Sequence, residues 1–308
     1  MTQKQANLVL ATVSIAWGLS YIFMKLGIDG MPPATIVALR CGIAFLVTVL
    51  IFGKKLPNIN RKLLKYASIS GALLAGIFAM LLYGIQNTSA TTAGFLTSTT
   101  VIMVPVIQAV LHRKFPSRNI MAGIVIVSIG LVLMTVHDQL TFDAGAIYCL
   151  AAALLYAVHI MVSNRFVRES DPLQLGIFQL GFAALYATAF TFMFEAPQLP
   201  DSPIHWIAIL GLALICSAYG FVMQSVAQKY TTAVSVAFLF SLEPIFSAIF
   251  AFFFLKEIVG LNSYAGAALI IAGVLTANRS MSSSTGKERE EKLRFSQNNR
   301  GDRHFLRK

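Results

Sequence analysis

The sequence predicts an all-α integral membrane protein of ten transmembrane helices, arranged as two inverted-topology repeats of five helices. Composition is the first indication: the 308 residues are 56% hydrophobic and 12% charged, with a mean hydropathy of +0.71. Soluble domains carry about 25% charged residues. The second indication is a series of apolar stretches that are each long enough to cross a bilayer. The third is a set of motifs that recurs in the two halves.

Ten apolar stretches of about 20 residues follow one another with short connections, so we expect no inserted soluble domain. The first stretch lacks a small-residue cleavage pattern, which argues against a removable signal peptide. After Arg279 the chain becomes polar and basic, and residues 280–308 are expected to form a disordered cytosolic tail. The expected spans are residues 6–27, 34–53, 65–86, 90–111, 119–136, 144–164, 174–194, 204–228, 232–255 and 261–278.

The basic residues predict the orientation, because cytoplasmic loops are enriched in Lys and Arg. With the N-terminus inside, thirteen of them fall on the inner side before the tail, whereas only Lys25 and Lys256 fall on the outer side. The net charge of +11 therefore indicates topology and not nucleic-acid binding. We expect a multi-pass protein of the cell (plasma or inner) membrane with both termini cytoplasmic. The inner set is Lys4, Lys54, Lys55, Arg61, Lys62, Lys65, Arg113, Lys114, Arg118, Arg165, Arg168, Lys229 and Arg279.

Four motif pairs recur in the same order in the two halves, separated by 139, 140, 139 and 143 residues. Because five helices precede it, the second half enters the membrane from the opposite face, as in the inverted repeats of secondary transporters. We expect repeats at residues 1–137 and 138–279, with a solute site at their interface. The pairs are Ala16-Trp17-Gly18 with Leu155-Tyr156-Ala157, Thr91-Thr92-Ala93 with Thr231-Thr232-Ala233, Val104-Pro105-Val106 with Glu243-Pro244-Ile245, and Gly123 and Gly130 with Gly266 and Gly273.

These motifs resemble those of the drug/metabolite transporter superfamily, EamA type, over about residues 6–278. The resemblance implies ten helices, two inverted repeats and export of small metabolites by alternating access. One departure is His112-Arg113-Lys114, which stands where a glycine-glutamate pair often closes the fourth helix. The resemblance is carried by Ala16-Trp17-Gly18-Leu19-Ser20, Ala38-Leu39-Arg40, Thr92-Ala93-Gly94-Phe95-Leu96 with Val104-Pro105, Leu242-Glu243-Pro244-Ile245 and Leu255-Lys256-Glu257.

Glu243 is the strongest indication of a functional site. It is the only charged residue of the stretch 232–255, and a carboxylate at mid-bilayer depth costs roughly 2.5–3.5 kcal/mol on insertion scales. The following Pro244 frees a backbone carbonyl one turn earlier, which a membrane protein tolerates only beside protein or a cavity. Burial favours the protonated carboxyl, which would suit proton coupling. The alternative is that Glu243 ties two helices together.

The first helix presents an aromatic and polar face, and the repeat places a similar face on the sixth helix. We expect the two faces to converge on a cavity that suits an amphipathic organic solute. His159 is a candidate proton carrier or solute ligand, with a structural hydrogen bond as the alternative. The candidates are Trp17, Ser20, Tyr21 and Met24 in the first helix, Tyr156, His159 and Ser163 in the sixth, and Tyr83, Thr97, Tyr219 and Met223 elsewhere.

Arg40 lies near the outer end of the second predicted helix. It is a candidate for an ion pair, for gating or for binding an anionic group, unless its long side chain snorkels to the interface. The glycine pairs Gly123/Gly130 and Gly266/Gly273 predict close helix packing, either within the chain or in a homodimer. The three cysteines lie in apolar stretches without metal-ligand spacing.

The expected function is a secondary transporter that exports small metabolites, amino acids or related amphipathic solutes, with or without proton coupling. A flippase for a lipid-linked small molecule is the alternative, followed by a membrane-embedded enzyme acting on lipid, for which the scattered histidines supply no paired acid and base. No Walker sequence is present, and we expect no cofactor. The expected partners are a small-molecule solute and membrane lipid, with no nucleic acid, in a monomer or homodimer.

Overall fold

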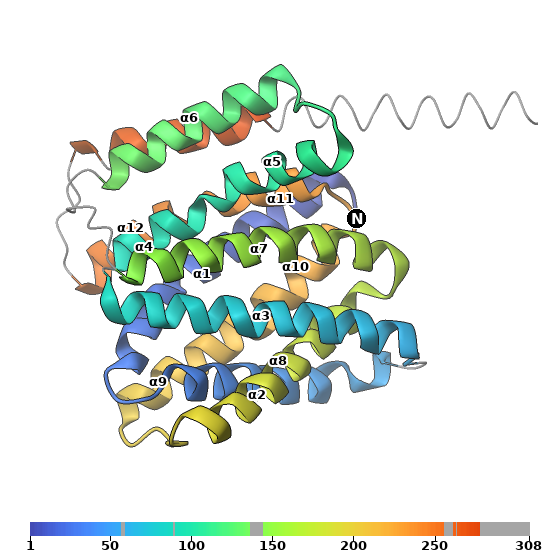
Figure 1. The fold of residues 1–308 in the computed structure, drawn as a ribbon, viewed down its shortest axis with the longest axis vertical. Coiled ribbons are helices and arrows are strands. Elements are labelled where there is room, and N and C mark those ends of the chain that lie inside the picture. Colours follow the sequence, from blue (N-terminus) through green and yellow to red (C-terminus); the bar gives the residue numbers. More distant parts are fainter. Residues whose placement is uncertain (57–58, 89, 136–143, 256–260, 263, 278–308) are drawn as a thin grey trace, which may run out of the picture.

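The computed structural model describes residues 1–308 with the exception of 57–58, 89, 136–143, 256–260, 263 and 278–308. The predicted tail therefore lies outside the described residues, as do Lys256 and Glu257. The described chain is a bundle of long helices that run side by side across the view of Figure 1. This all-helical architecture confirms the predicted fold class.

The first half forms α1 (Gln3–Ile28), α2 (Pro33–Phe52), a short 3₁₀ turn (Gly53–Lys55), α3 (Arg61–Asn87), α4 (Ala90–Ser98), α5 (Thr100–His112) and α6 (Arg118–Thr135). Local signals explain several of these boundaries. Thr2 and Gln5 form a capping box at the start of α1, and the Asn60 side chain caps α3. Pro33 occupies the first position of α2, where a missing N–H costs no helical hydrogen bond.

The second half forms α7 (Ala144–Glu169), α8 (Pro172–Phe194), α9 (Pro203–Gly211), the π-helical segment η2 (Leu212–Tyr219), α10 (Gly220–Gln228), α11 (Ala233–Phe240), α12 (Glu243–Leu255) and a last apolar helix (Tyr264–Ala277). The Asp171, Ser202 and Thr232 side chains cap α8, α9 and α11. Pro172 opens α8 as Pro33 opens α2, and the two prolines are 139 residues apart. The helix starts therefore share the spacing of the sequence motifs.

Eight helical stretches in the described residues are long and apolar enough to cross a membrane. Two shorter apolar helices, Arg118–Leu133 and Tyr264–Ala277, occupy the fifth and tenth predicted positions. The eight long stretches are Gln3–Ile28, Pro33–Lys55, Arg61–Asn87, Thr92–His112, Ala144–Glu169, Pro172–Phe194, Pro203–Gln228 and Ala233–Phe254. Each of the ten predicted spans thus has a helical counterpart, although two counterparts are shorter than a typical span.

Two of the predicted spans are interrupted, and Pro244 had indicated the second of these breaks in the sequence. The fourth breaks at Thr99, between α4 and α5, and the ninth breaks at Ser241 and Leu242, between α11 and α12. Pro244 lacks an N–H, so the Phe240 carbonyl loses its regular helical donor. The nearby Leu239 carbonyl accepts a hydrogen bond from the Ser14 hydroxyl of α1, 3.0 Å away. A neighbouring helix therefore compensates part of the break.

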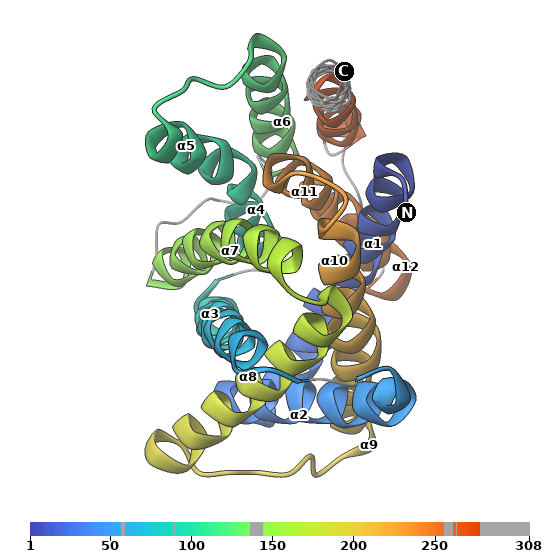
Figure 2. The same ribbon diagram turned by 90° about the vertical axis from the view of Figure 1, so that its right-hand side faces the viewer.

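The two halves are packed into each other. Helix α1 packs chiefly against α9 to α12 of the second half, and α7 packs against α3, α4 and α5 of the first half. Figure 2 shows α2 crossing α8 on one side of the bundle, while α6 and the last helix lie side by side at the opposite end. Contacts thus occur in exchanged pairs, as an approximate two-fold relation between five-helix halves requires.

The predicted glycine stripes of the two halves face each other, one on α6 and the other on the last helix. A Cβ on Gly130 would lie 2.7 Å from the Gly266 carbonyl oxygen, and a Cβ on Gly123 would lie 3.0 Å from the Gly273 carbonyl oxygen. Only hydrogen at these positions allows the backbones of α6 and the last helix to approach so closely. Of the two arrangements that the sequence left open, the structure has the pairing within one chain.

Candidate functional site

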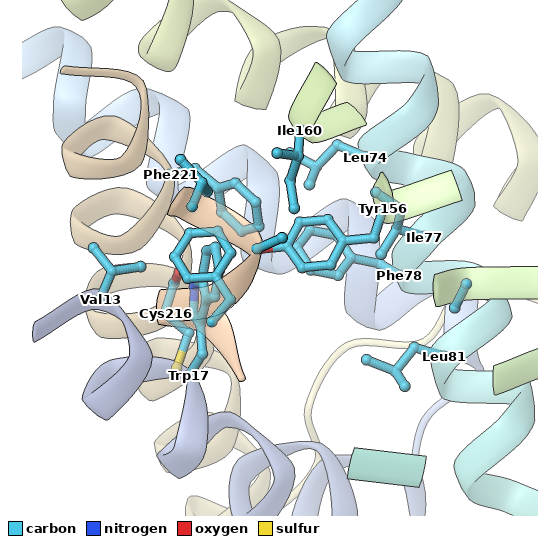
Figure 3. Close-up of a cluster of buried hydrophobic side chains, with 14 of the residues drawn as sticks. Val13, Trp17, Leu74, Ile77, Phe78, Leu81, Tyr156, Ile160, Cys216 and Phe221 are labelled. Atoms are coloured by element: carbon cyan, nitrogen blue, oxygen red, sulfur yellow. The ribbon is translucent and has the colours of Figure 1, made fainter. Parts of the chain in front are cut away.

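An aromatic cluster lies where the two halves meet, and Trp17 of α1 is at its centre. Its ring centroid is 5.8 Å from that of Tyr156 (α7), 4.9 Å from that of Phe221 (α10) and 4.6 Å from that of Phe240 (α11). The Trp17 indole N–H donates to the Cys216 carbonyl at 2.8 Å, within the π-helical segment. Figure 3 shows the rings of Trp17, Tyr156 and Phe221 converging from different helices. The predicted convergence of the α1 and α7 faces is therefore realised by Trp17 and Tyr156.

A cavity of about 410 Å³, counting the part open to solvent, borders this aromatic cluster. Both halves contribute to the walls, and the wall residues of α1 run from its middle toward its C-terminal end. The lining residues are Trp17, Ser20, Met24, Arg40, Ile77, Phe78, Leu81, Thr97, Tyr156, Phe221 and Glu243.

Glu243 stands at the first position of α12, directly after the break, and its side chain is buried at the cavity. The Tyr21 hydroxyl lies within hydrogen-bonding reach of the Glu243 carboxyl group and of the Thr97 hydroxyl. Thr97 also donates to the Ala93 carbonyl at 2.7 Å. Tyr21 itself does not line the cavity but supports two residues that do. The acid thus has a protein partner on one side and the cavity on the other.

Arg40 is buried, with 1% of its surface exposed, so it does not snorkel to an interface. Its Nε donates to the Ser217 hydroxyl at 2.9 Å, and its guanidinium carbon lies 3.9 Å from the centroid of the Phe78 ring. The ion pairs among the described residues are Lys62–Glu169, Arg165–Glu169 and His205–Asp201. Arg40 is in none of them, and it shares the cavity with Glu243 without pairing to it.

His159 and Ser163 are not among the residues that line the cavity. The His159 ring contacts both of those rings, and its Nε2 lies 3.1 Å from Gln179 Oε1 and 3.4 Å from the Ser163 hydroxyl. Gln179 continues the network by donating to the Ser225 hydroxyl at 3.1 Å. The predicted α7 face is therefore divided, with Tyr156 at the cavity and His159 and Ser163 in a buried polar network.

Three further candidates lie away from the cavity. The Tyr83 hydroxyl donates to Glu195 Oε1 at 2.9 Å, and the same carboxylate accepts the Ala34 N–H at 3.1 Å, at the start of α2. The Tyr219 hydroxyl lies 2.6 Å from that of Thr12, and the Tyr219 side chain is exposed on the bundle surface. Met223 packs against the main hydrophobic core.

Sequence reasoning missed the apolar wall of the cavity. Ile77, Phe78 and Leu81 share one face of α3, and Phe221 lies in the eighth span. These residues look like ordinary core residues in the sequence, because no polar group or repeat motif marks them. A helical face that runs from Ile77 through Phe78 to Leu81 was the available signal, but apolar faces of this kind occur in every packed helix.

A membrane-spanning helical bundle with a partly charged, aromatic cavity between two interlocked halves defines the class of membrane transport proteins. Comparison with known proteins gives the family. The model of the EamA-like transporter family matches the chain twice, over residues 4–136 and 143–279. The chain therefore belongs to the EamA-like transporter family, as its motifs indicated.

Relatives are similar over most of their length. An uncharacterized transporter of Archaeoglobus fulgidus is 27% identical over 275 residues, covering 88% of this chain and 84% of that protein. The uncharacterized transporter YoaV of Bacillus subtilis is 26% identical over 276 residues, covering 86% and 94%. A solved crystal structure superposes with a TM-score of 0.76 at 17% identity, covering 90% of this chain and 98% of the other. That likeness supports the fold.

Proposed function

We propose that this EamA-family protein is a secondary transporter that exports small metabolites, amino acids or related amphipathic solutes, by alternating access around the central cavity. The single observation that carries the proposal is Glu243, an acid that stands at a helix break and borders the cavity between the two halves. An ionisable residue within a membrane span usually marks a solute or ion route.

The walls support the choice of solute. Trp17, Tyr156, Phe78 and Phe221 offer ring surfaces for an apolar side chain, whereas Ser20 and the two ionisable groups offer polar contacts. This mixture of apolar surface and a few fixed polar groups is typical of sites for amphipathic molecules. In this proposal the protein lies in the plasma or inner membrane with both termini cytoplasmic, acts without enzymatic turnover of its solute, and exchanges protons through Glu243.

The test is uptake of radiolabelled amino acids into proteoliposomes, with and without an imposed pH gradient. We expect saturable uptake of at least one amino acid that the gradient accelerates in the wild-type protein and not in Glu243→Gln. The matched control is Asp201→Asn, because the Asp201 side chain is 76% exposed and does not line the cavity. If Glu243→Gln responds to the gradient as the wild-type protein does, proton exchange through Glu243 is wrong. If folded wild-type protein takes up no amino acid, the proposed solute class is wrong.

A further inference from the structure

The guanidinium of Arg40 is the least compensated charge of the cavity. Its Nε is used by Ser217 and one face of its plane lies against Phe78, but its two terminal nitrogens make no hydrogen bond to a described residue. An arginine remains protonated in proteins. Keeping this cation buried without a carboxylate is strongly unfavourable unless another group supplies the negative charge.

The acid of the cavity does not supply that charge. Glu243 and Arg40 both line the cavity, but no ion pair joins them in the described part of the chain. Glu243 is instead held by the Tyr21 hydroxyl, next to Thr97. The cavity therefore keeps the Glu243 carboxyl group and the Arg40 guanidinium group apart, and each of the two groups has its own protein partner.

Building on the proposed transport function, we infer that Arg40 is the subsite for the carboxylate of the solute. The guanidinium is already oriented by Ser217 and Phe78. Its terminal nitrogens, which bond to none of the described residues, form the fork that binds a carboxylate through two hydrogen bonds. Ile77, Phe78 and Leu81 give the adjoining apolar wall. Glu243 is the only acid and Arg40 the only guanidinium or ammonium group among the lining residues, so the walls match a solute with one anionic and one cationic group.

The number of charged groups in the cavity also distinguishes between classes of anionic solute. A phosphate monoester carries a charge near −2 at neutral pH, and the cavity offers it one cation together with an acid. A single carboxylate matches the one guanidinium without excess negative charge. The inference is therefore specific for a monocarboxylate, and the amino group or another cationic group of the same molecule would face Glu243.

Trp17 provides a binding signal that does not require transport. The chain has two tryptophans, and Trp206 in α9 is 41% exposed, away from the cavity. In a Trp206→Phe background, the fluorescence of Trp17 reports occupancy of the cavity. The probes are L-leucine, L-phenylalanine and L-glutamine, each compared with its carboxamide, in which the carboxylate is replaced by a neutral group of similar shape.

We expect at least one acid to bind about tenfold or more tightly than its amide, because the amide cannot accept the charge-assisted pair of hydrogen bonds. Arg40→Gln is expected to weaken binding of the acid to the level of the amide and to leave binding of the amide within about twofold. The control is Arg165→Gln, whose side chain is 77% exposed. If Arg40→Gln weakens the acid and the amide by the same factor, Arg40 has only a structural role and the inference is wrong.

Arg40→Lys keeps the test decisive if Arg40→Gln does not fold. Lysine retains the charge but loses the Nε donor to Ser217 and the planar fork, so the preference for acid over amide should fall at least about threefold. An unchanged preference contradicts the inference. If the wild-type protein binds acid and amide equally, only the inference fails. If it binds neither, the proposed function fails for these solutes as well.

Discussion

The two halves of the molecule share a scaffold and differ in the chemistry that they bring to the centre. Arg40 lies seven residues after Pro33 in α2, and Gln179 lies seven residues after Pro172 in α8. Glu243 aligns with Val104, because Pro244 and Pro105 are 139 residues apart. Each half therefore contributes one ionisable residue where the other contributes a neutral one.

This asymmetry has an electrostatic reason. A strictly symmetric cavity would hold two guanidinium groups or two carboxylates close together, and like charges in a poorly solvated space oppose each other's ionisation. With one charge of each sign from different halves, the cavity offers two unlike binding points and keeps its net charge low. In the proposed function, the repeated fold would allow alternating access, and the unrepeated residues would select the solute.

The largest expected effect comes from moving the acid to the other half. Val104 is completely buried in the core, so Val104→Glu places a carboxyl group where no cavity receives it. We expect it to lower the free energy of unfolding by about 3 kcal/mol or more, measured by thermal unfolding in detergent. Glu243→Gln should leave stability nearly unchanged but slow uptake by about 10²-fold, the typical contribution of a group that transfers protons.

The double variant decides whether the two positions are interchangeable. We expect Val104→Glu combined with Glu243→Gln to remain inactive, because Tyr21 and Thr97 lie beside position 243. Transport by a stable double variant would show that positions 104 and 243 are chemically equivalent and that the two halves do not differ in this respect.

The next effect concerns a region where the halves are truly alike. Gly130→Ala and Gly123→Ala should each destabilise the protein, by about 1–3 kcal/mol, because the added methyl group meets a backbone carbonyl of the last helix. The two values should agree within about 1 kcal/mol if the contact is two-fold related. Gly53→Ala is the control, because a Cβ there meets nothing within 4 Å. The unfolding temperatures in detergent give all three values, and a destabilised control would show that the assay does not report this packing.

A smaller effect tests alternating access, in which the cavity opens to one side of the membrane at a time. Met24 lines the cavity, whereas Ser163, its counterpart on α7, is buried in the His159 network. In a variant without the three native cysteines, we expect Met24→Cys and Ser163→Cys to react with a membrane-impermeant thiol reagent from opposite sides. Solute binding should change the two labelling rates in opposite directions, by at least about threefold. Labelling of both from the same side would contradict alternating access through related faces.

The smallest effect is expected from the tail. Truncation after Arg279 should leave transport within about twofold of the full-length rate, because the polar and basic composition of residues 280–308 does not favour a packed core. The measurement is uptake into proteoliposomes at matched protein content. A truncated protein that inserts normally but fails to transport would give the tail a role in function.

The sequence was sufficient for the fold class and for part of the site. Composition and the motif spacing predicted the helical membrane fold, and helical periodicity predicted that Trp17, Ser20 and Met24 share a face. The cavity also includes the predicted Tyr156, Thr97, Arg40 and Glu243. Their use as binding residues remains a prediction, as do the repeat boundaries and the orientation in the membrane.

The features that the sequence did not predict depend on how the helices pack against each other. Tyr83 and Tyr219 are polar aromatics in spans, like Tyr156, but their hydroxyls meet Glu195 and Thr12 instead of the cavity. Pro244 indicated the helix break beside it, but the break at Thr99 and the π-helical segment went unpredicted, because Pro105 indicates a disturbance without placing it. Such details arise from tertiary contacts between residues more than 100 positions apart.

The packing of α1 has a consequence for biogenesis. The Trp17 indole finds its hydrogen-bond acceptor in η2, and the Ser14 hydroxyl, which also contacts the Leu10 carbonyl of its own helix, finds a second acceptor in α11. Both distant acceptors lie more than 190 residues later in the chain. Helix α1 therefore cannot reach these contacts until the eighth and ninth spans have been synthesised. Until then the Trp17 indole N–H needs another acceptor, such as water, a lipid head group or the insertion machinery. The packing of α1 thus makes the completion of the first half depend on the synthesis of the second.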